Sequence, residues 1–192
     1  MMNDSQETGQ RLRSPLEGQA SVPFNLCAAV PAPLELHRCN VKAEWVDYNQ
    51  HMSESCYLLV FGDSSDAFFR YAGIDEAYRA QGHSLYTAES YIRNLREVGL
   101  GEPLRLTLRL LDFDHKRLHI AHAMYHANRN TLLATAEQIL VHVDMNAGKS
   151  TPLPMDLRAR FEVIHRAHAQ APGDGTGNTL LSIERRGSAA TV

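Results

Sequence analysis

Polar and apolar residues alternate along several segments of this chain, and each alternation predicts a strand. The segment 38–45 changes between polar and apolar at every step, which indicates a half-buried strand. Further strand-like segments follow at 85–97, 104–110, 117–127 and 132–144. The last of them is apolar on both faces, as expected of a strand with a neighbour on each side.

A helical period interrupts this series directly after the first predicted strand. Apolar residues recur at helical spacing from position 57 to position 71, with Ser53 as an N-cap and Gly73 as a left-handed C-terminal cap. A short helix is expected at 75–81, and Pro154 opens a last one. The order of one strand, a long helix and an antiparallel meander predicts an α+β fold.

The two ends of the chain differ in composition from its centre. Four prolines and no sustained period mark residues 1–34, which we expect to form a flexible N-terminal arm. Residues 170–192 are rich in Gly, Ser and Thr, which is typical of a disordered tail. The functional domain is therefore predicted at 35–169.

Composition narrows the class of protein. The chain has 192 residues, 44% of them hydrophobic, which suffices for one domain with a sizeable core. A net charge of −3 without a long basic block argues against nucleic acid or a membrane as partner. Cys27, Cys39 and Cys56 lack metal-binding spacing and indicate free thiols in a reducing compartment. No apolar run approaches the roughly 20 residues that span a bilayer, so we expect a cytoplasmic protein.

The densest polar group is Asp47, Asn49 and His51, between the first predicted strand and the long helix. A carboxylate can attack a carbonyl or activate water, an imidazole can move protons, and an amide can orient a partner. Backbone N–H groups near Ser53 and Glu54, at the start of the helix, can stabilise an oxyanion. Asp, Asn and His are also ordinary turn and capping residues, so a purely structural role stays open.

The run from Asp47 to Met52 (DYNQHM), with Tyr57 in the helix, resembles the signature of hotdog-fold thioesterases. Similarity to the 4-hydroxybenzoyl-CoA thioesterase-like branch extends over about residues 36–155, including DHKRLH at 114–119 and LATAEQILVHVD at 133–144. The resemblance implies a hotdog fold, in which a curved antiparallel sheet wraps around a long central helix. It also implies a homodimer or homotetramer with active sites at subunit interfaces.

The DxNxH core also resembles the motif of plant acyl-ACP thioesterases, in which the matching Asp, Asn and His are catalytic together with a Glu on the following strand. Glu97 matches that Glu in plant acyl-ACP thioesterases by local context, and Glu89 matches the bacterial branch. Both have the same parity, so we expect them on one face of a strand, separated by roughly 27 Å of rise. Only one of them can then reach the site, and a solvent-facing charge is the alternative for either.

Four histidines, His115, His119, His122 and His126, crowd into one segment. On a helix, His122 and His126 would share a face and could bind zinc. On the expected strand they stand about 13 Å apart, too far for one ion. We therefore predict no metal site, and we expect His142 to be a core residue or a partly satisfied strand residue.

Other residues are candidates for holding the substrate. Lys116 and Arg117 can receive the phosphates of coenzyme A, although a solvated hairpin tip explains them slightly better. Tyr48 and Tyr57 can line an acyl pocket. The DYNxHM and DHKRLH segments are similar to thioesterases of carnitine breakdown, which hydrolyse betainyl-CoA. A trimethylammonium acyl group favours an aromatic pocket through cation–π attraction, for which Trp45 is a further candidate.

The sequence thus leads to the hypothesis of an acyl-CoA thioesterase in which Asp47 attacks the acyl carbon or activates water. Because a thioester is already reactive, this chemistry needs no organic cofactor and no metal. Two other functions stay open: a hotdog hydratase or dehydratase acting on acyl thioesters, and a non-enzymatic acyl-CoA-binding domain.

Overall fold

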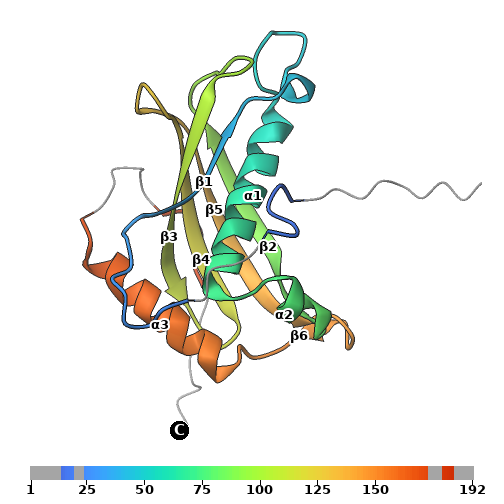
Figure 1. Ribbon diagram of the computed structural model, residues 1–192, viewed down its shortest axis with the longest axis vertical. Helices are drawn as coiled ribbons and strands as arrows, with labels where there is room; N and C mark the ends of the chain where they lie inside the picture. Colours follow the sequence, from blue (N-terminus) through green and yellow to red (C-terminus); the bar gives the residue numbers. More distant parts are fainter. Residues whose placement is uncertain (1–13, 20–23, 173–178, 184–192) are drawn as a thin grey trace, which may run out of the picture.

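One antiparallel sheet and one long helix form the centre of the molecule, as the computed structural model shows (Figure 1). The structure describes residues 14–19, 24–172 and 179–183, so the predicted arm and tail lie partly outside the described residues. In chain order the elements are β1 (Leu34–Asn40), a 3-10 turn (Ala43–Trp45), α1 (Glu54–Ala72), α2 (Glu76–Ala80), β2 (His83–Asn94), β3 (Pro103–Phe113), β4 (Arg117–His126), β5 (Thr131–Asp144), β6 (Lys149–Ser150) and α3 (Met155–Gln170).

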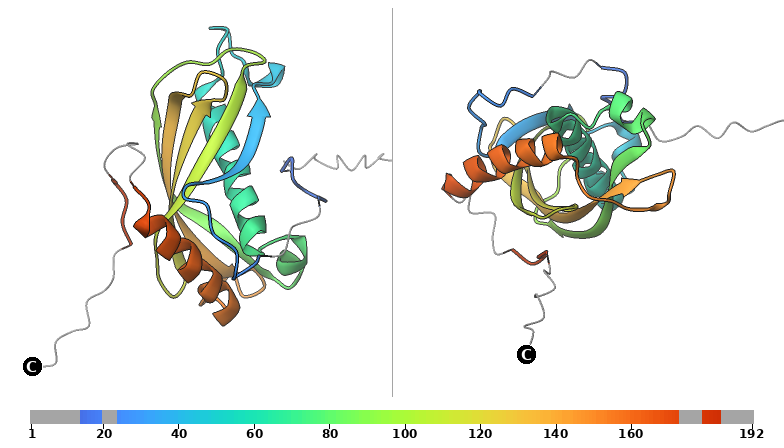
Figure 2. Two further views of the ribbon diagram at one scale, coloured as in Figure 1. Left: turned by 60° about the vertical axis from the view of Figure 1, so that its left-hand side comes forward. Right: turned by 90° about the horizontal axis from the view of Figure 1, so that it is seen from below.

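The strands follow the order β1-β3-β4-β5-β2, with the short β6 paired to β5, and every pairing is antiparallel. β5 has a neighbour on each side, as its apolar faces predicted. The sheet curves around α1 in both views of Figure 2. The predicted α+β hotdog arrangement is therefore confirmed.

The first predicted strand is wrong in its position. The strand ends at Asn40, and residues 43–45 form a 3-10 turn. Asn40 pairs with Pro103, the first residue of β3, so among the described residues no strand continues beside a longer β1. The alternation of apolar residues continues beyond Asn40 because Val41 and Trp45 are buried by the turn.

Apolar side chains bury α1 along its whole length. Near its N-terminal half, Phe61 packs with Met124 and other residues of the sheet. Near its C-terminal half, Phe68 lies 6.0 Å from Phe161 of α3 between ring centroids, in a second cluster that includes Ile120. Burial of each such side chain contributes about 1.5–3 kcal/mol, so the sheet and α3 together fix the position of α1.

Both predicted ends of α1 are confirmed. Ser53 occupies the N-cap position, and Gly73 adopts a left-handed φ of 98° at the C-terminal end. The N–H groups of Gly73 and Ile74 return to the carbonyls of Arg70 and Phe69, which satisfies the end of the helix.

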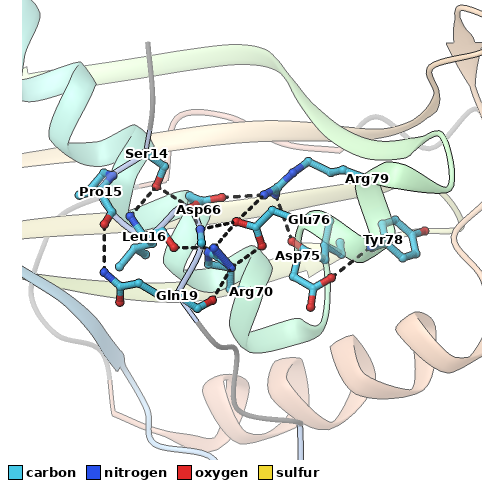
Figure 3. A network of polar contacts seen from close by, with 12 residues as sticks. Ser14, Pro15, Leu16, Gln19, Asp66, Arg70, Asp75, Glu76, Tyr78 and Arg79 are labelled. Carbon is cyan, nitrogen blue, oxygen red and sulfur yellow. Dashed lines mark hydrogen bonds and ion pairs between the residues drawn. The ribbon is translucent and has the colours of Figure 1, made fainter. Parts of the chain in front are cut away.

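Residues 14–19 lie against α1 and α2 (Figure 3). Arg70 of α1 is buried, and it donates to the carbonyl of Leu16 at 2.5 Å and to Glu76 Oε2 at 2.8 Å. The N–H of Gly18 donates to Glu76 Oε1 at 3.0 Å and is the main cause of the lowered pKa of this carboxyl. One buried guanidinium thus joins this part of the arm to both helices.

Two further features of the chain are the state of its cysteines and the composition of its helices. Cys27, Cys39 and Cys56 are free thiols, as predicted. Within the described residues, no helix combines the length and the apolar composition needed to cross a membrane.

Candidate active site

The motif Asp47–His51 forms a tight turn directly before α1. The N–H of Asp47 donates to the carbonyl of His51, and the N–H of Gln50 donates to the carbonyl of Asp47, both at 3.0 Å. Inside the turn, the N–H of Asn49 donates to Asp47 Oδ1 at 2.8 Å. The half-buried Asp47 carboxylate therefore shapes the turn through one oxygen and keeps Oδ2 without a partner among the described residues.

α1 begins next to this turn, and its first N–H groups have no partner within the part of the chain that the structure describes. The N–H of Ser53 donates to the carbonyl of Trp45 at 2.8 Å, while its hydroxyl makes no capping bond to the helix. Of the residues that the structure describes, none accepts a hydrogen bond from the N–H of Glu54 or Ser55. These two donors, at the positive end of the helix dipole, are available to an oxyanion.

The segment after β2 brings one predicted carboxylate to the motif. The N–H of Met52 donates to the carbonyl of Val98 at 2.8 Å, and His51 forms an isolated bridge with Gly99. As a result, Glu97 Oε2 lies 3.4 Å from His51 Nδ1. A carboxylate in this position can orient an imidazole and stabilise its protonated form.

The structure does not bring Glu89 to the same place. Its neighbour Ser90 accepts from Gln138 at 3.4 Å on the face of the sheet that covers α1, so Glu89 points to the outer face. β2 ends at Asn94, and a register shift follows Thr87. The expectation that Glu89 and Glu97 share one strand face is therefore wrong, because only Glu89 belongs to the strand.

A cleft of about 320 Å³ opens beside the start of α1. Its lining consists of Met52, Glu54, Tyr57, Asn94, Leu95, Arg96 and Glu97. Tyr57 is buried, and its hydroxyl donates to the carbonyl of Arg96 at 3.1 Å. Burial raises the pKa of Tyr57, with the charge of Glu97 acting in the same direction. The Glu54 carboxylate makes no hydrogen bond or ion pair with any described residue, and Asp47 does not belong to the lining.

A larger cavity of about 560 Å³ follows another side of α1. It is lined by Ser14, Ser55, Leu58, Leu59, Gly62, Asp63, Thr87, Ser90 and Gln138. Burial raises the pKa of Asp63 to about 6, while Lys42 opposes this shift and Asp66 adds to it. The cavity thus contains one carboxylate whose charge is partly desolvated.

Lys116 and Arg117 lie at the far end of β4 from the motif. Arg117 Nε donates to Asp114 Oδ2 at 2.9 Å, in the turn that precedes the strand. The other end of β4 is His126, 3.5 Å from Glu102 in the segment that contacts the motif. Since β4 has nine steps of about 3.3 Å, these residues stand about 30 Å apart. Within one chain, the predicted phosphate-binding pair and the motif are not brought together.

The histidines occupy separate environments. His122 and His126 are buried on β4, and His119 lies 3.1 Å from Glu137. Among the described residues, no group of three or more His, Cys, Asp or Glu side chains is placed to hold a metal ion. His142 is a core residue, as predicted, with Nε2 2.7 Å from the hydroxyl of Tyr78.

Sequence reasoning missed three residues of the small cleft, namely Asn94, Leu95 and Arg96. The sequence predicts one strand over 85–97, whereas the chain turns after Asn94 and the N–H groups of Leu95 and Arg96 both donate to the carbonyl of Leu133. No Gly or Pro marks this turn, so the local sequence carries no signal for it.

Comparisons with known proteins agree on one family. A family model described as the thioesterase-like superfamily matches residues 41–161. A Rhizobium meliloti protein named L-carnitine dehydrogenase/betainyl-CoA thioesterase is 48% identical over 147 residues, which cover 76% of this chain and 29% of that protein. The betainyl-CoA thioesterase of Pseudomonas aeruginosa is 39% identical over 149 residues, 77% of this chain and 94% of its own length.

Solved structures show the same architecture. A candidate thioesterase from Pseudomonas putida KT2440 superposes with a TM-score of 0.65 at 31% identity, over 80% of this chain and 100% of the other. The chain therefore matches a complete structure of this kind, although it spans less than a third of the Rhizobium relative.

Proposed function

Because this chain belongs to the thioesterase-like superfamily, we propose that it hydrolyses an acyl-CoA thioester to a free acid and coenzyme A. The observation that carries the proposal is the set of backbone donors and polar side chains at the start of α1. There, two N–H groups without a partner in the described ranges follow the Asp47 turn, close in sequence to the pair of His51 and Glu97. Thioester hydrolysis needs an oxyanion site and a group that supplies or activates the nucleophile, and this place offers both.

Asp47 supplies the nucleophile by one of two routes. It attacks the acyl carbon and displaces the thiolate, leaving an anhydride that water hydrolyses, or it takes a proton from a water molecule that attacks. Over a full cycle of either route one water molecule is consumed, the acyl group leaves as a free acid and the sulfur gains a proton. The carbonyl oxygen of the substrate faces the N–H groups of Glu54 and Ser55 while its negative charge grows.

His51 and Asn49 assist this chemistry. His51 lies next to Glu97, so the imidazole is oriented to carry a proton to the leaving sulfur. Asn49 is exposed, and its side-chain amide can orient the water or the substrate. The proposal includes no cofactor and no metal, because the thioester is activated by its own sulfur.

The proposed enzyme is a homodimer. Asp47 is half-buried and the neighbouring Tyr48 is 90% exposed, so a further surface is needed to exclude water from the motif. β2 is the last strand of the sheet, with Tyr86 and Tyr91 exposed on it. An open strand edge of this kind is a template for pairing with a second copy.

The proposed acyl group is the betainyl group, as the names of the relatives suggest. Among the aromatic candidates, Tyr57 lines the small cleft and can contact a trimethylammonium group. Trp45 is 5% exposed and already has the ammonium of Lys42 4.9 Å from its ring centroid, so it is not available. The cytoplasmic location expected from the sequence stays a prediction.

A thiol-release assay tests the proposed activity. The protein is mixed with betainyl-CoA, 4-hydroxybenzoyl-CoA and medium-chain acyl-CoAs, and free coenzyme A is measured by its reaction with a thiol reagent. We expect Asp47→Asn to lower kcat by orders of magnitude while the circular dichroism spectrum stays that of the unaltered protein.

Each other outcome has a distinct meaning. Conversion of acyl-CoA without thiol release indicates a hydratase or dehydratase. Binding without turnover indicates a non-enzymatic domain. If Asp47→Asn keeps near-normal turnover, the assignment of Asp47 is wrong.

A further inference from the structure

We propose that the Glu54 carboxylate selects acyl groups that carry a quaternary ammonium, by acting as their counter-charge at the start of α1. The inference rests on the proposed thioesterase function and identifies the residue that sets its acyl specificity. It differs from the role already given to this position, which concerns the backbone N–H and not the side chain.

The size of the acyl group limits where a counter-charge can lie. In a betainyl group only one methylene separates the carbonyl carbon from the nitrogen, so the two atoms are about 2.5 Å apart by ordinary bond lengths. If the carbonyl oxygen faces the first N–H groups of α1, the cation must lie at the same end of the helix. The recognising carboxylate must therefore belong to the first turn of α1 or to a segment that touches it.

Four carboxylates near α1 can be compared on this basis. Asp63 lies nine residues after Glu54, which is about 13 Å along the helix, too far for so short an acyl group. Asp47 is assigned to the reacting carbon, and Glu97 has His51 3.4 Å away. Glu54 lines the small cleft and has no partner among the described residues, so its charge is available to a ligand.

The position of Glu54 also explains how a neutral acyl group is rejected. The carboxylate is attached to the residue whose N–H is offered to the oxyanion, so a growing negative charge on the substrate lies close to a fixed one. Like charges at this distance repel each other and raise the barrier. A cationic acyl group cancels this repulsion, whereas an uncharged group of equal shape does not. Glu54 thus favours one class of substrate and disfavours the other.

The test compares two substrates that differ only in charge. Betainyl-CoA and 3,3-dimethylbutanoyl-CoA have the same shape, because a carbon atom replaces the quaternary nitrogen. For the full chain, we expect Glu54→Gln to lower kcat/KM for betainyl-CoA about tenfold or more and to raise kcat/KM for the neutral substrate. The discrimination by the unaltered protein should also weaken as salt is added, because the pair is partly exposed.

Two further variants are compared with Glu54→Gln. Glu54→Asp keeps the charge and should keep most of the discrimination, which also shows that the start of α1 still folds. Glu162→Gln removes an equal charge from the exposed face of α3, where Glu162 lies 3.7 Å from Arg166, and should change neither substrate.

The remaining outcomes overturn the proposal in distinguishable ways. If Glu54→Gln lowers turnover of both substrates equally, or of neither, the carboxylate does not act as a counter-charge. If the unaltered protein hydrolyses the neutral substrate and not betainyl-CoA, the selectivity is wrong while the thioesterase function stands. If it releases coenzyme A from neither substrate nor from other acyl-CoAs, the proposed function itself fails.

Discussion

The buried His122 makes the stability of this protein depend on pH. Its Nε2 lies 3.2 Å from Ser65 Oγ, its Nδ1 has no partner among the described residues, and its ring centroid is 5.5 Å from that of Phe61. Burial lowers the pKa of His122 from 6.5 to about 4, although a hydrogen bond to the side chain of Gln138 acts in the opposite direction. The folded protein therefore keeps this imidazole neutral at pH values where the unfolded chain protonates it.

The sign and size of the effect follow from this difference. Below pH 6.5 the unfolded chain binds a proton that the folded chain refuses, so the free energy of unfolding falls as the pH falls. The gap between about 4 and 6.5 corresponds to about 3 kcal/mol in full, of which about 2 kcal/mol is lost by pH 5.

Urea titrations at pH 7.5, 6 and 5 measure this contribution when His122→Gln is compared with the unaltered protein. Gln can still donate to Ser65 but does not titrate, so the difference in free energy of unfolding between the two proteins should change by about 2 kcal/mol across this range. Any loss of packing in the variant is independent of pH and cancels. The protein concentration is kept constant because assembly alters apparent stability. If the two proteins show parallel pH dependence, His122 does not carry the effect.

Two further predictions concern the site and the arm. Glu97→Gln should lower kcat about tenfold to a hundredfold, since the imidazole loses the carboxylate that orients it, whereas Glu89→Gln on the outer face should stay within about twofold. Equal losses in steady-state assays would contradict this placement. Arg70→Met should lower the free energy of unfolding by about 3 kcal/mol, a fall in Tm of about 6–12 °C, because carboxylates and a carbonyl lose a buried partner. Arg166→Met, which breaks an exposed ion pair, should change Tm by less than about 2 °C in the same thermal scan.

The sequence predicted the elements of this fold because local patterns and tertiary packing agree in most of the chain. The helix at 54–72 has a helical apolar period, and Gly73 occupies its expected left-handed position. Apolar residues alternate with polar ones in the strand at 103–113, and the strand at 131–144 is apolar on both faces, as its two neighbouring strands require. Each of these elements buries the face that its own sequence identifies as apolar.

The sequence was less informative where a partner segment decides the structure. β1 ends at Asn40 because β3 starts at Pro103, more than sixty positions later. Likewise, the alternating pattern predicted a strand that includes Glu97. In the structure, backbone hydrogen bonds to the carbonyl of Leu133 turn the chain after Asn94. Neither constraint is local, so a period of two residues could predict that strands exist but not where they stop.

The motif and the proposed acyl-binding cleft are formed by different residues, which the sequence could not show. The Asp47 carboxylate accepts from the N–H of Asn49 and shapes the turn before α1, while Glu54 and Tyr57 line a cleft beside the start of α1. In the proposed reaction, the attacking group, the oxyanion and a short acyl group meet at the start of α1, which follows the motif and adjoins the cleft. For an acyl group as small as betaine, catalysis and specificity must then depend on the same few residues. A change of charge at Glu54 alters which thioester is cleaved without moving the residues that cleave it.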